Sequence, residues 1–185
     1  MIKKYESYVG KSAIIYHGYW GGADEDDHPD SPDDRLELLD SHGVSATCDI
    51  INYDREWALD KCKSLFEREA EKCKNVDVLI GFSLGGYMAF KLAGYLSKDV
   101  ILVNPAIDRS ITKLHIKEFN APKSMNFGNM EVYLGEKDTL IDKEVTLRYL
   151  KKNGIKCESW IVGGMQHGTS LWQFNKIIEN SKILK

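Results

Sequence analysis

The sequence predicts an α/β fold, a three-layer α/β/α sandwich around a mostly parallel sheet of about six strands. Six short apolar runs rich in Val and Ile recur along the chain, at 13–16, 44–50, 76–80, 100–103, 130–134 and 157–162. Several of them are apolar throughout, which is typical of strands buried on both faces of a parallel sheet. Segments with helical periodicity separate the runs, and this alternation favours right-handed crossovers between parallel strands.

Two of the expected helices have clear signals. One opens with Ser31, a good N-cap, followed by Pro32, which suits the first helical position, and by acidic residues. The other runs from about 54 to 74, and the residues on its apolar stripe are Ala58, Cys62, Leu65, Phe66, Ala70 and Cys73. Three more helices are expected to begin at Ser83, near Asp142 and near Leu171.

Composition excludes several classes of protein. The chain has 185 residues, of which 43% are hydrophobic and 29% charged, and its net charge is −3. This profile predicts one globular domain spanning 1–185 and excludes a disordered, collagen-like or membrane-spanning chain. Because there is no basic excess, neither nucleic acid nor a membrane surface is an expected partner. Residues 105–128 have weak periodicity and contain two prolines, which predicts a short irregular segment and a lid over the ligand-binding edge.

The cysteines at 48, 62, 73 and 157 form no CxxC pair and have no zinc-like spacing to a histidine. We therefore expect reduced thiols and no metal site. Residues 1–10 carry charges and no apolar run, which predicts no signal peptide and a cytoplasmic protein. The exposed edges of a small sheet permit a homodimer.

The most informative motif is G-x-S-x-G, formed by Gly81, Ser83 and Gly85. An apolar run leads into it and a helix-forming segment follows, which is the strand–turn–helix setting of a nucleophilic serine. Such a turn strains the serine backbone, needs small neighbours and directs a helix N-terminus at the site. Ser83 is therefore the candidate nucleophile, and the alternative is a helix-capping serine in a glycine-rich turn.

Two backbone N–H groups are placed to stabilise an oxyanion. The first apolar run ends in His17 and Gly18, and the N–H of Tyr19 follows it. The N–H of Leu84 comes directly after the candidate nucleophile. His17 itself is expected to be structural and hydrogen-bonded beneath this loop, because it precedes the nucleophile in the chain. The other histidines, which we expect at the surface, are His28, His42 and His115.

An acid and a histidine are expected to follow the serine, in that order. The run at 130–134 ends in a glycine-led turn that contains Asp138, and the active-site residues of open α/β sheets gather at such carboxyl ends. Asp138 is the expected acid, Glu136 is an outside alternative, and Asp142 is expected to cap the next helix. His167, in a glycine-flanked loop after the last run, is the expected base, its tautomer held by the acid.

Four segments resemble, in order, the functional motifs of the α/β-hydrolase superfamily: the strand ending in His17-Gly18, the nucleophile elbow at 81–86, the acidic turn at 135–138 and the loop at 164–168. Together with 103–106 they look most like the small YqiA-type (UPF0227) esterases. The resemblance covers roughly residues 12–182. It implies serine-esterase or thioesterase chemistry without a cofactor, a triad of Ser83, Asp138 and His167, and an oxyanion hole formed by Tyr19 and Leu84. Few residues precede the first run and no large cap is present, so a minimal version of the fold is expected.

Seven acidic residues crowd the segment after Tyr19, at 24–27, 30, 33 and 34. A solvated loop that leads into a helix N-terminus accounts for them, whereas the order of residues differs from a calcium-binding loop. A third interpretation follows from position, since the segment leaves directly from the expected oxyanion hole. Its charge would repel anions at the site entrance, which favours neutral or cationic esters over acyl-CoA.

The expected function is hydrolysis of small or medium carboxylic esters or thioesters through an acyl-enzyme on Ser83. The same triad can also serve an amidase or a peptidase. An alternative of a different class is a non-catalytic protein that binds a small molecule or another protein on the same scaffold. The presence of all three triad members in the sequence argues against that alternative.

Overall fold

The fold is given by a computed structural model, which describes residues 10–18, 32–48, 51, 53, 62–107 and 125–185. Within these ranges lie the six strands of one sheet: β1 (Ser12–Tyr16), β2 (Ser45–Cys48), β3 (Val78–Phe82), β4 (Asp99–Val103), β5 (Met130–Gly135) and β6 (Glu158–Val162). The strand order is β2-β1-β3-β4-β5-β6, and each neighbouring pair is parallel. The parallel sheet confirms the predicted fold class and places the carboxyl ends of the strands along one edge.

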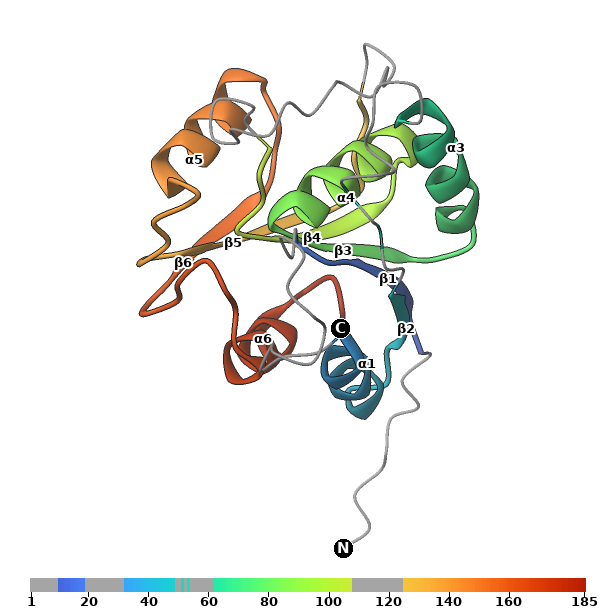
Figure 1. The fold of residues 1–185 in the computed structure, drawn as a ribbon, viewed down its shortest axis with the longest axis horizontal. Coiled ribbons are helices and arrows are strands. Elements are labelled where there is room, and N and C mark those ends of the chain that lie inside the picture. The colour runs from blue at the N-terminus through green and yellow to red at the C-terminus, as the bar shows by residue number, and fades with distance from the viewer. Residues whose placement is uncertain (1–9, 19–31, 49–50, 52, 54–61, 108–124) are drawn as a thin grey trace, which may run out of the picture.

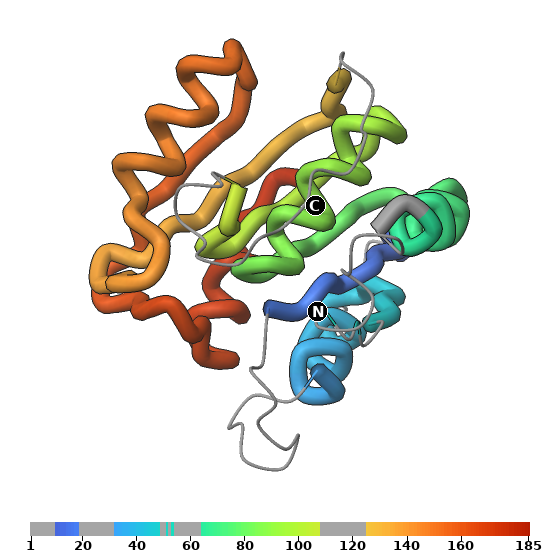
Figure 2. The backbone as a smooth tube through the Cα atoms, turned by 45° about the horizontal axis from the view of Figure 1, so that its top comes forward, coloured from blue at the N-terminus to red at the C-terminus, as the bar shows by residue number. Residues whose placement is uncertain are grey.

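Helices cover both faces of this sheet (Figure 1). One face carries α3 (Cys62–Cys73), α4 (Ser83–Leu96) and α5 (Lys143–Lys152), and the other carries α1 (Pro32–Ser41) and α6 (Leu171–Asn180). Figure 2 shows α4 between α3 and α5, where it packs on β1, β3 and β4. The result is the three-layer sandwich that the sequence predicts.

The core is divided by the sheet into two layers, because successive side chains of a strand point to opposite faces. In β3, Leu79 packs in the layer of α3, α4 and α5, whereas Val78 and Ile80 pack in the layer of α1 and α6. All five residues of β3 are buried. An unbroken apolar run is therefore what this central strand requires.

The two edge strands differ from that expectation. Burial in β2 alternates, with Ser45 and Thr47 exposed, and in β6 the side chain of Ile161 is 51% exposed. Each of these strands has a neighbour on one side only, so part of its surface faces solvent. The predicted run at 44–50 overlaps β2, and its last two residues lie outside the described ranges.

The predicted start of the third strand was wrong. The run at 76–80 was expected to be a strand, but the backbone N–H of Val76 bonds to the carbonyl oxygen of Cys73 in the turn that ends α3. Strand β3 begins at Val78, which pairs with Ala13 of β1. Of the predicted helix at 54–74, the described part begins at Cys62. Cys48, Cys73 and Cys157 form no disulfide among the described residues.

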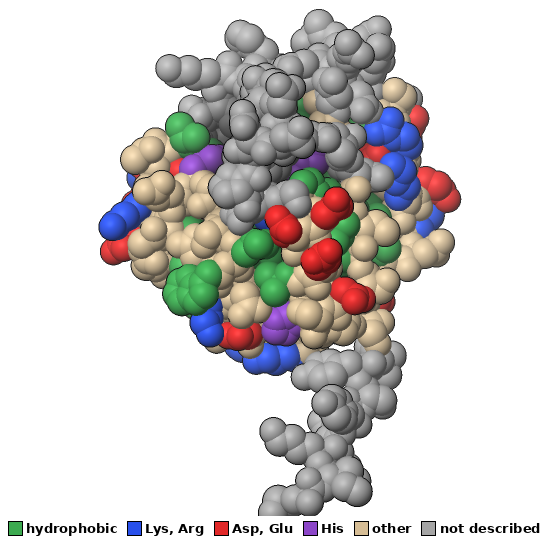
Figure 3. All heavy atoms as spheres, turned by 60° about the horizontal axis from the view of Figure 1, so that its bottom comes forward, with side chains coloured by type: hydrophobic (Ala, Val, Ile, Leu, Met, Phe, Trp, Pro, Cys, Tyr) green, Lys and Arg blue, Asp and Glu red, His purple; other side chains and the backbone are tan. Residues whose placement is uncertain are grey.

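The face formed by α1 and α6 carries exposed acidic side chains (Figure 3), and α1 contributes Asp33, Glu37 and Asp40. Asp33 stands in the first turn of α1, where the helix dipole favours a negative charge. Residues 24–31 of the acidic segment and 108–124 of the predicted lid lie outside the described ranges. The lid and the role of the acidic segment therefore stay predictions.

Candidate active site

The turn between β3 and α4 presents Ser83 at the carboxyl edge of the sheet. Phe82 is the last residue of β3 and Ser83 is the first of α4. Ser83 has φ of 50°, in the left-handed region, where a residue with a Cβ costs roughly 1–2 kcal/mol. Its side chain is half-buried. The turn thus holds Ser83 in an unfavourable backbone conformation and leaves the residue only partly buried.

Glycines on both sides of Ser83 are required by the close approach of three elements. A Cβ at Gly81 would lie 2.6 Å from the carbonyl oxygen of Gly85 and 2.7 Å from Ala89 Cβ. A Cβ at Gly85 would collide with backbone carbonyl oxygens at the end of β1. The motif therefore lets α4 begin in direct contact with β1 and β3, which places Ser83 beside the end of β1.

His167 connects Ser83 to Asp138. Its Nε2 lies 2.9 Å from Ser83 Oγ, and its Nδ1 lies 2.9 Å from Asp138 Oδ2. A carboxylate can only accept, so Nδ1 carries the proton and Nε2 offers its lone pair to the serine hydroxyl. The structure therefore brings together the three residues predicted as nucleophile, base and acid.

Asp138 is held by three hydrogen bonds, from the His167 ring and from two backbone N–H groups. Its side chain is 1% exposed, against 25% for His167. Burial raises the pKa of Asp138, but the hydrogen bond from His167 and those from the backbone N–H groups of Ile141 and Leu140 outweigh it, and the pKa is lowered from 3.8. The two backbone bonds measure 2.9 Å and 2.8 Å. The carboxylate is thus ionised and fixed, as is needed to stabilise an imidazolium.

The two alternative acids have other partners. Asp142 caps α5 by accepting a hydrogen bond from the N–H of Glu144 at 2.8 Å, as predicted. Glu136 accepts from the N–H of Gly164 at 3.0 Å and links the loop after β5 to the loop that carries the histidine. Each carboxylate therefore has a structural partner away from the imidazole.

Leu84, one of the two predicted oxyanion donors, lies at the N-terminus of α4. Leu84 is buried in the first turn of α4, and the N-cap residue Phe82 gives no side-chain hydrogen bond to that turn. The first N–H groups of a helix lack intrahelical acceptors and so favour negative charge. Gly18 packs against the nucleophile, since a Cβ there would be 3.2 Å from Ser83 Cβ. Tyr19, the other predicted donor, lies outside the described residues.

His17 is structural, as predicted. It is 3% exposed, its Nδ1 lies 2.6 Å from the carbonyl oxygen of Gly18, and its Nε2 accepts from the N–H of Ile51 at 2.9 Å. The hydroxyl of Tyr53 donates to the His17 carbonyl oxygen at 2.6 Å. His17 therefore holds Ile51 and Tyr53, which follow β2, against the end of β1.

Sequence analysis missed Arg35, a buried cation beneath the site. It belongs to α1 and is 7% exposed. Its guanidinium carbon lies 4.2 Å from the centre of the Phe82 ring, and the guanidinium donates to the carbonyl oxygen of Thr169 at 3.1 Å. Arg35 thus contacts Phe82, which directly precedes Ser83, and Thr169, which follows His167 by two residues. In the sequence it stands out only as a cation within an acidic segment.

Sequence analysis also assigned no role to Asn104, which follows β4 directly and is 1% exposed. Its side-chain amide bonds to backbone groups of Gly135, Gln166 and His167. One signal in the sequence could have identified Asn104. It is a polar residue at the carboxyl end of a central strand, and that strand lies between the strands of the nucleophile and the acid.

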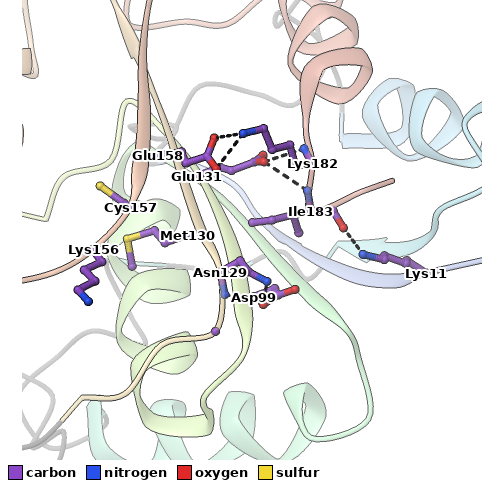
Figure 4. Close-up of a pocket in the computed structure, with 11 residues that line it drawn as sticks. Lys11, Asp99, Asn129, Met130, Glu131, Lys156, Cys157, Glu158, Lys182 and Ile183 are labelled. Carbon is purple, nitrogen blue, oxygen red and sulfur yellow. Dashed lines mark hydrogen bonds and ion pairs between the residues drawn. The ribbon is translucent and has the colours of Figure 1, made fainter.

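A cavity of about 490 Å³, drawn in Figure 4, is lined by residues at the amino ends of β4, β5 and β6. It therefore lies at the opposite edge of the parallel sheet from the triad residues. Its charged groups bind one another and the C-terminal segment: Lys182 pairs with Glu158 at 2.7 Å, and Glu131 accepts from the backbone N–H of Lys182 at 2.7 Å. Lys11 donates to the carbonyl oxygen of Ile183. These contacts attach the C-terminal segment to the amino ends of the strands.

In the ranges that the structure describes, no three His, Cys, Asp or Glu side chains gather into a metal-ligand set. None of the helices in these ranges has the length and apolar content to cross a bilayer.

The remaining histidines were expected at the surface. His42 is half-buried, and its Nε2 lies 2.8 Å from Asn175 Oδ1. His28 and His115 fall outside the described part of the chain.

Comparison with known proteins identifies the fold. No protein-family model and no curated protein matches the sequence. The carboxylesterase Cest-2923 from Lactobacillus plantarum is 16% identical over 100% of this chain and 83% of its own, with a TM-score of 0.59. XC6422 from Xanthomonas campestris, an α/β serine hydrolase without a lid, is 13% identical over 94% and 82%, with a TM-score of 0.59. The S-formylglutathione hydrolase FrmB from Staphylococcus aureus is 11% identical over 95% and 84%, with a TM-score of 0.65. At these identities the shared property is the fold, and the chain therefore has the fold of the α/β-hydrolase superfamily.

Proposed function

We propose that the protein is a serine hydrolase that cleaves small or medium carboxylic esters or thioesters. The observation that carries the proposal is the hydrogen-bonded path from Ser83 Oγ through the His167 imidazole to Asp138, with 2.9 Å at each end. A serine hydroxyl is a weak nucleophile until a base removes its proton. The Nε2 of His167 lies within the distance that such a transfer needs.

In the proposed reaction, Ser83 Oγ bonds to the substrate carbonyl carbon while His167 Nε2 takes the hydroxyl proton. The carbonyl oxygen becomes an oxyanion, which the N–H groups of Leu84 and Tyr19 would stabilise. The imidazolium then protonates the leaving alcohol or thiol as its C–O or C–S bond breaks, which leaves an acyl group on Ser83. A water molecule that gives its proton to His167 then attacks the acyl carbon. The bond between that carbon and Ser83 Oγ breaks as the imidazolium returns the proton to Oγ, which releases the carboxylic acid.

The choice of bond to be cleaved follows from the similar structures and from the sequence motifs. The similar structures include a carboxylesterase and a hydrolase named for a thioester, so both bond types belong to the proposal. The resemblance of 103–106 and the four motifs to YqiA-type esterases supports the ester substrate.

The acidic residues at 24–34 add a proposal about substrate charge. We infer that neutral or cationic esters are hydrolysed faster than acyl-CoA of equal chain length at low ionic strength, because negative charges repel at long range when salt is low. Faster hydrolysis of the acyl-CoA under those conditions would contradict this preference and would leave the proposed roles of Ser83, Asp138 and His167 unchanged.

The test of the proposed function is rapid-mixing kinetics with nitrophenyl esters of increasing chain length. A burst of one nitrophenol per chain is expected, followed by slower turnover, because nitrophenol is a good leaving group and deacylation is therefore the slower step. Ser83→Ala should show neither phase. Ser97→Ala is the matched control, because Ser97 also has a left-handed φ, of 57°, but lies at the other end of α4. Folded wild-type protein with neither burst nor turnover would overturn the proposal, and cleavage of amides alone would replace it with an amidase or peptidase.

A further inference from the structure

We propose that Asn104 is a positioning residue, whose side-chain amide aligns His167 with Ser83 and Asp138. The inference rests on the proposed function, and it assigns a role to a residue that touches none of the three reacting side chains. Asn104 follows β4, which lies between β3 and β5 in the sheet. It therefore stands between the strand that leads to the nucleophile and the strand that leads to the acid.

The amide of Asn104 binds three backbone groups. Its Oδ1 accepts from the N–H of Gly135 at 2.6 Å, and its Nδ2 donates to the carbonyl oxygens of Gln166 at 2.8 Å and His167 at 3.1 Å. Because a backbone N–H can only donate and a carbonyl oxygen can only accept, these partners fix the orientation of the amide. Asn104 thus joins the end of β5 to the backbone of the histidine itself.

Two backbone bonds add the remaining connections. The N–H of Asn104 donates to the carbonyl oxygen of Tyr133 in β5 at 2.9 Å, and the N–H of Ala106 donates to the carbonyl oxygen of Ser83 at 2.9 Å. The segment that starts at Asn104 therefore contacts the nucleophile turn, the strand of the acid and the loop of the base. The three loops that bear the triad are linked through one short stretch of chain.

The backbone of Asn104 is itself held in the left-handed region, with φ of 44°. Asparagine tolerates this conformation better than most residues with a Cβ. With the side chain 1% exposed, water cannot replace its three hydrogen bonds. Few other residues combine a tolerated left-handed φ, one acceptor and two donors at this length.

The contacts of Asn104 act on the part of the loop that carries His167. Gly168 and Gly163 have nothing within 4 Å of a Cβ added to them, so the loop is not packed tightly there. The side-chain amide of Asn104 donates to the backbone carbonyl oxygens of Gln166 and His167 and so restrains this part of the loop. A displacement of the imidazole by about 1 Å would lower the rate of serine attack about 100-fold.

Three substitutions separate this role from simple filling of space. Asn104→Asp keeps the size of the side chain and the acceptor for Gly135, but faces the carbonyls of Gln166 and His167 with a second acceptor. Asn104→Ala removes all three bonds, and Asn104→Gly does so while relieving the backbone strain. We expect all three to lower kcat about 100-fold or more with little change in KM, and Asn104→Asp to be no milder than Asn104→Ala. If the side chain of Asn104 only filled space, Asn104→Asp would lower kcat the least of the three variants.

The deciding measurement does not require turnover. Proton NMR detects the His167 Nδ1–H, whose signal the hydrogen bond to Asp138 shifts far downfield. We expect the signal in wild type and in Asn153→Asp, which loses one exposed amide-to-carbonyl bond of the same kind, to Tyr149. The signal should be shifted or lost in each folded Asn104 variant, with Asn104→Gly the variant that folds most readily.

The outcomes separate the two proposals. A wild-type signal that is unchanged in folded Asn104→Asp and Asn104→Gly, or kcat values within about threefold of wild type, would overturn the role of Asn104. A signal that depends on Asn104 in a protein that hydrolyses no ester or thioester would keep the positioning role and reject the proposed function instead.

Discussion

The imidazole Nε2 of His167 lies 2.9 Å from Ser83 Oγ, although 84 residues separate the two in the chain. The contact forms because Ser83 follows β3 and His167 follows β6 in a parallel sheet, so both stand at the same edge. Neither residue is placed by its neighbours in sequence alone. The geometry couples a hydroxyl to a base whose other nitrogen is bonded to a carboxylate.

The rate of hydrolysis should fall on the acid side with a slope of one proton. Only the neutral imidazole of His167 can take the Ser83 proton. Asp138 adds no second proton in the range where imidazoles titrate, because its pKa is lowered from 3.8. The measurement is kcat between about pH 5 and pH 8, and a flat profile would contradict the role of His167 as base.

Asp138→Asn should lower kcat by about 10⁴-fold, because an amide that donates to Nδ1 selects the wrong imidazole tautomer. It should also change acid stability. The pKa of Asp138 is below 3.8 in the folded protein, so its stabilising contribution is fully present above the ordinary value and is lost as the pH falls through the folded one. Urea unfolding at neutral pH and near pH 3 should therefore show the difference between wild type and variant shrinking in acid. A constant difference would argue against the ionised carboxylate.

Gly85→Ala should destabilise the protein by about 3 kcal/mol or more, because the new Cβ collides with backbone carbonyls that cannot move independently of β1. Gly163→Ala is the control, since a Cβ there has nothing within 4 Å. Urea midpoints of the two variants provide the comparison. Equal stabilities would mean that the turn is looser than its contacts indicate.

The strained turn predicts an order of stability for two inactive variants. Ser83→Gly should be more stable than Ser83→Ala by about 1 kcal/mol, because glycine adopts a φ of 50° without a Cβ penalty. Both variants lack the hydroxyl, so the comparison isolates the backbone. Thermal unfolding of both, side by side, measures the difference. If Ser83→Ala were the more stable variant, the backbone of Ser83 would not be strained.

The sequence was informative where local pattern decides structure. The central strand β3 is buried on both faces, so its apolar run was recognisable, whereas β2 has the mixed sequence SATC of an edge strand. Ser83 and His167 were predictable because glycines at fixed spacing mark the turns that hold them.

Other features depend on contacts between distant segments. Asn104 acts through Gly135 and Gln166, 31 and 62 residues away, and Arg35 acts through Thr169, 134 residues away. The boundary of β3 was likewise set by its pairing with β1 rather than by the apolar residues alone. No local pattern contains that information.

The central claim is that His167 activates the hydroxyl of Ser83, and a fluorophosphonate tests it most directly because it reacts with activated serines whatever their substrate. Intact mass should show one adduct on wild type and on Ser97→Ala, and none on Ser83→Ala. Labelling should also slow by several orders of magnitude in His167→Ala. Folded wild-type protein that gains no adduct, or an adduct that persists in Ser83→Ala, would contradict the claim.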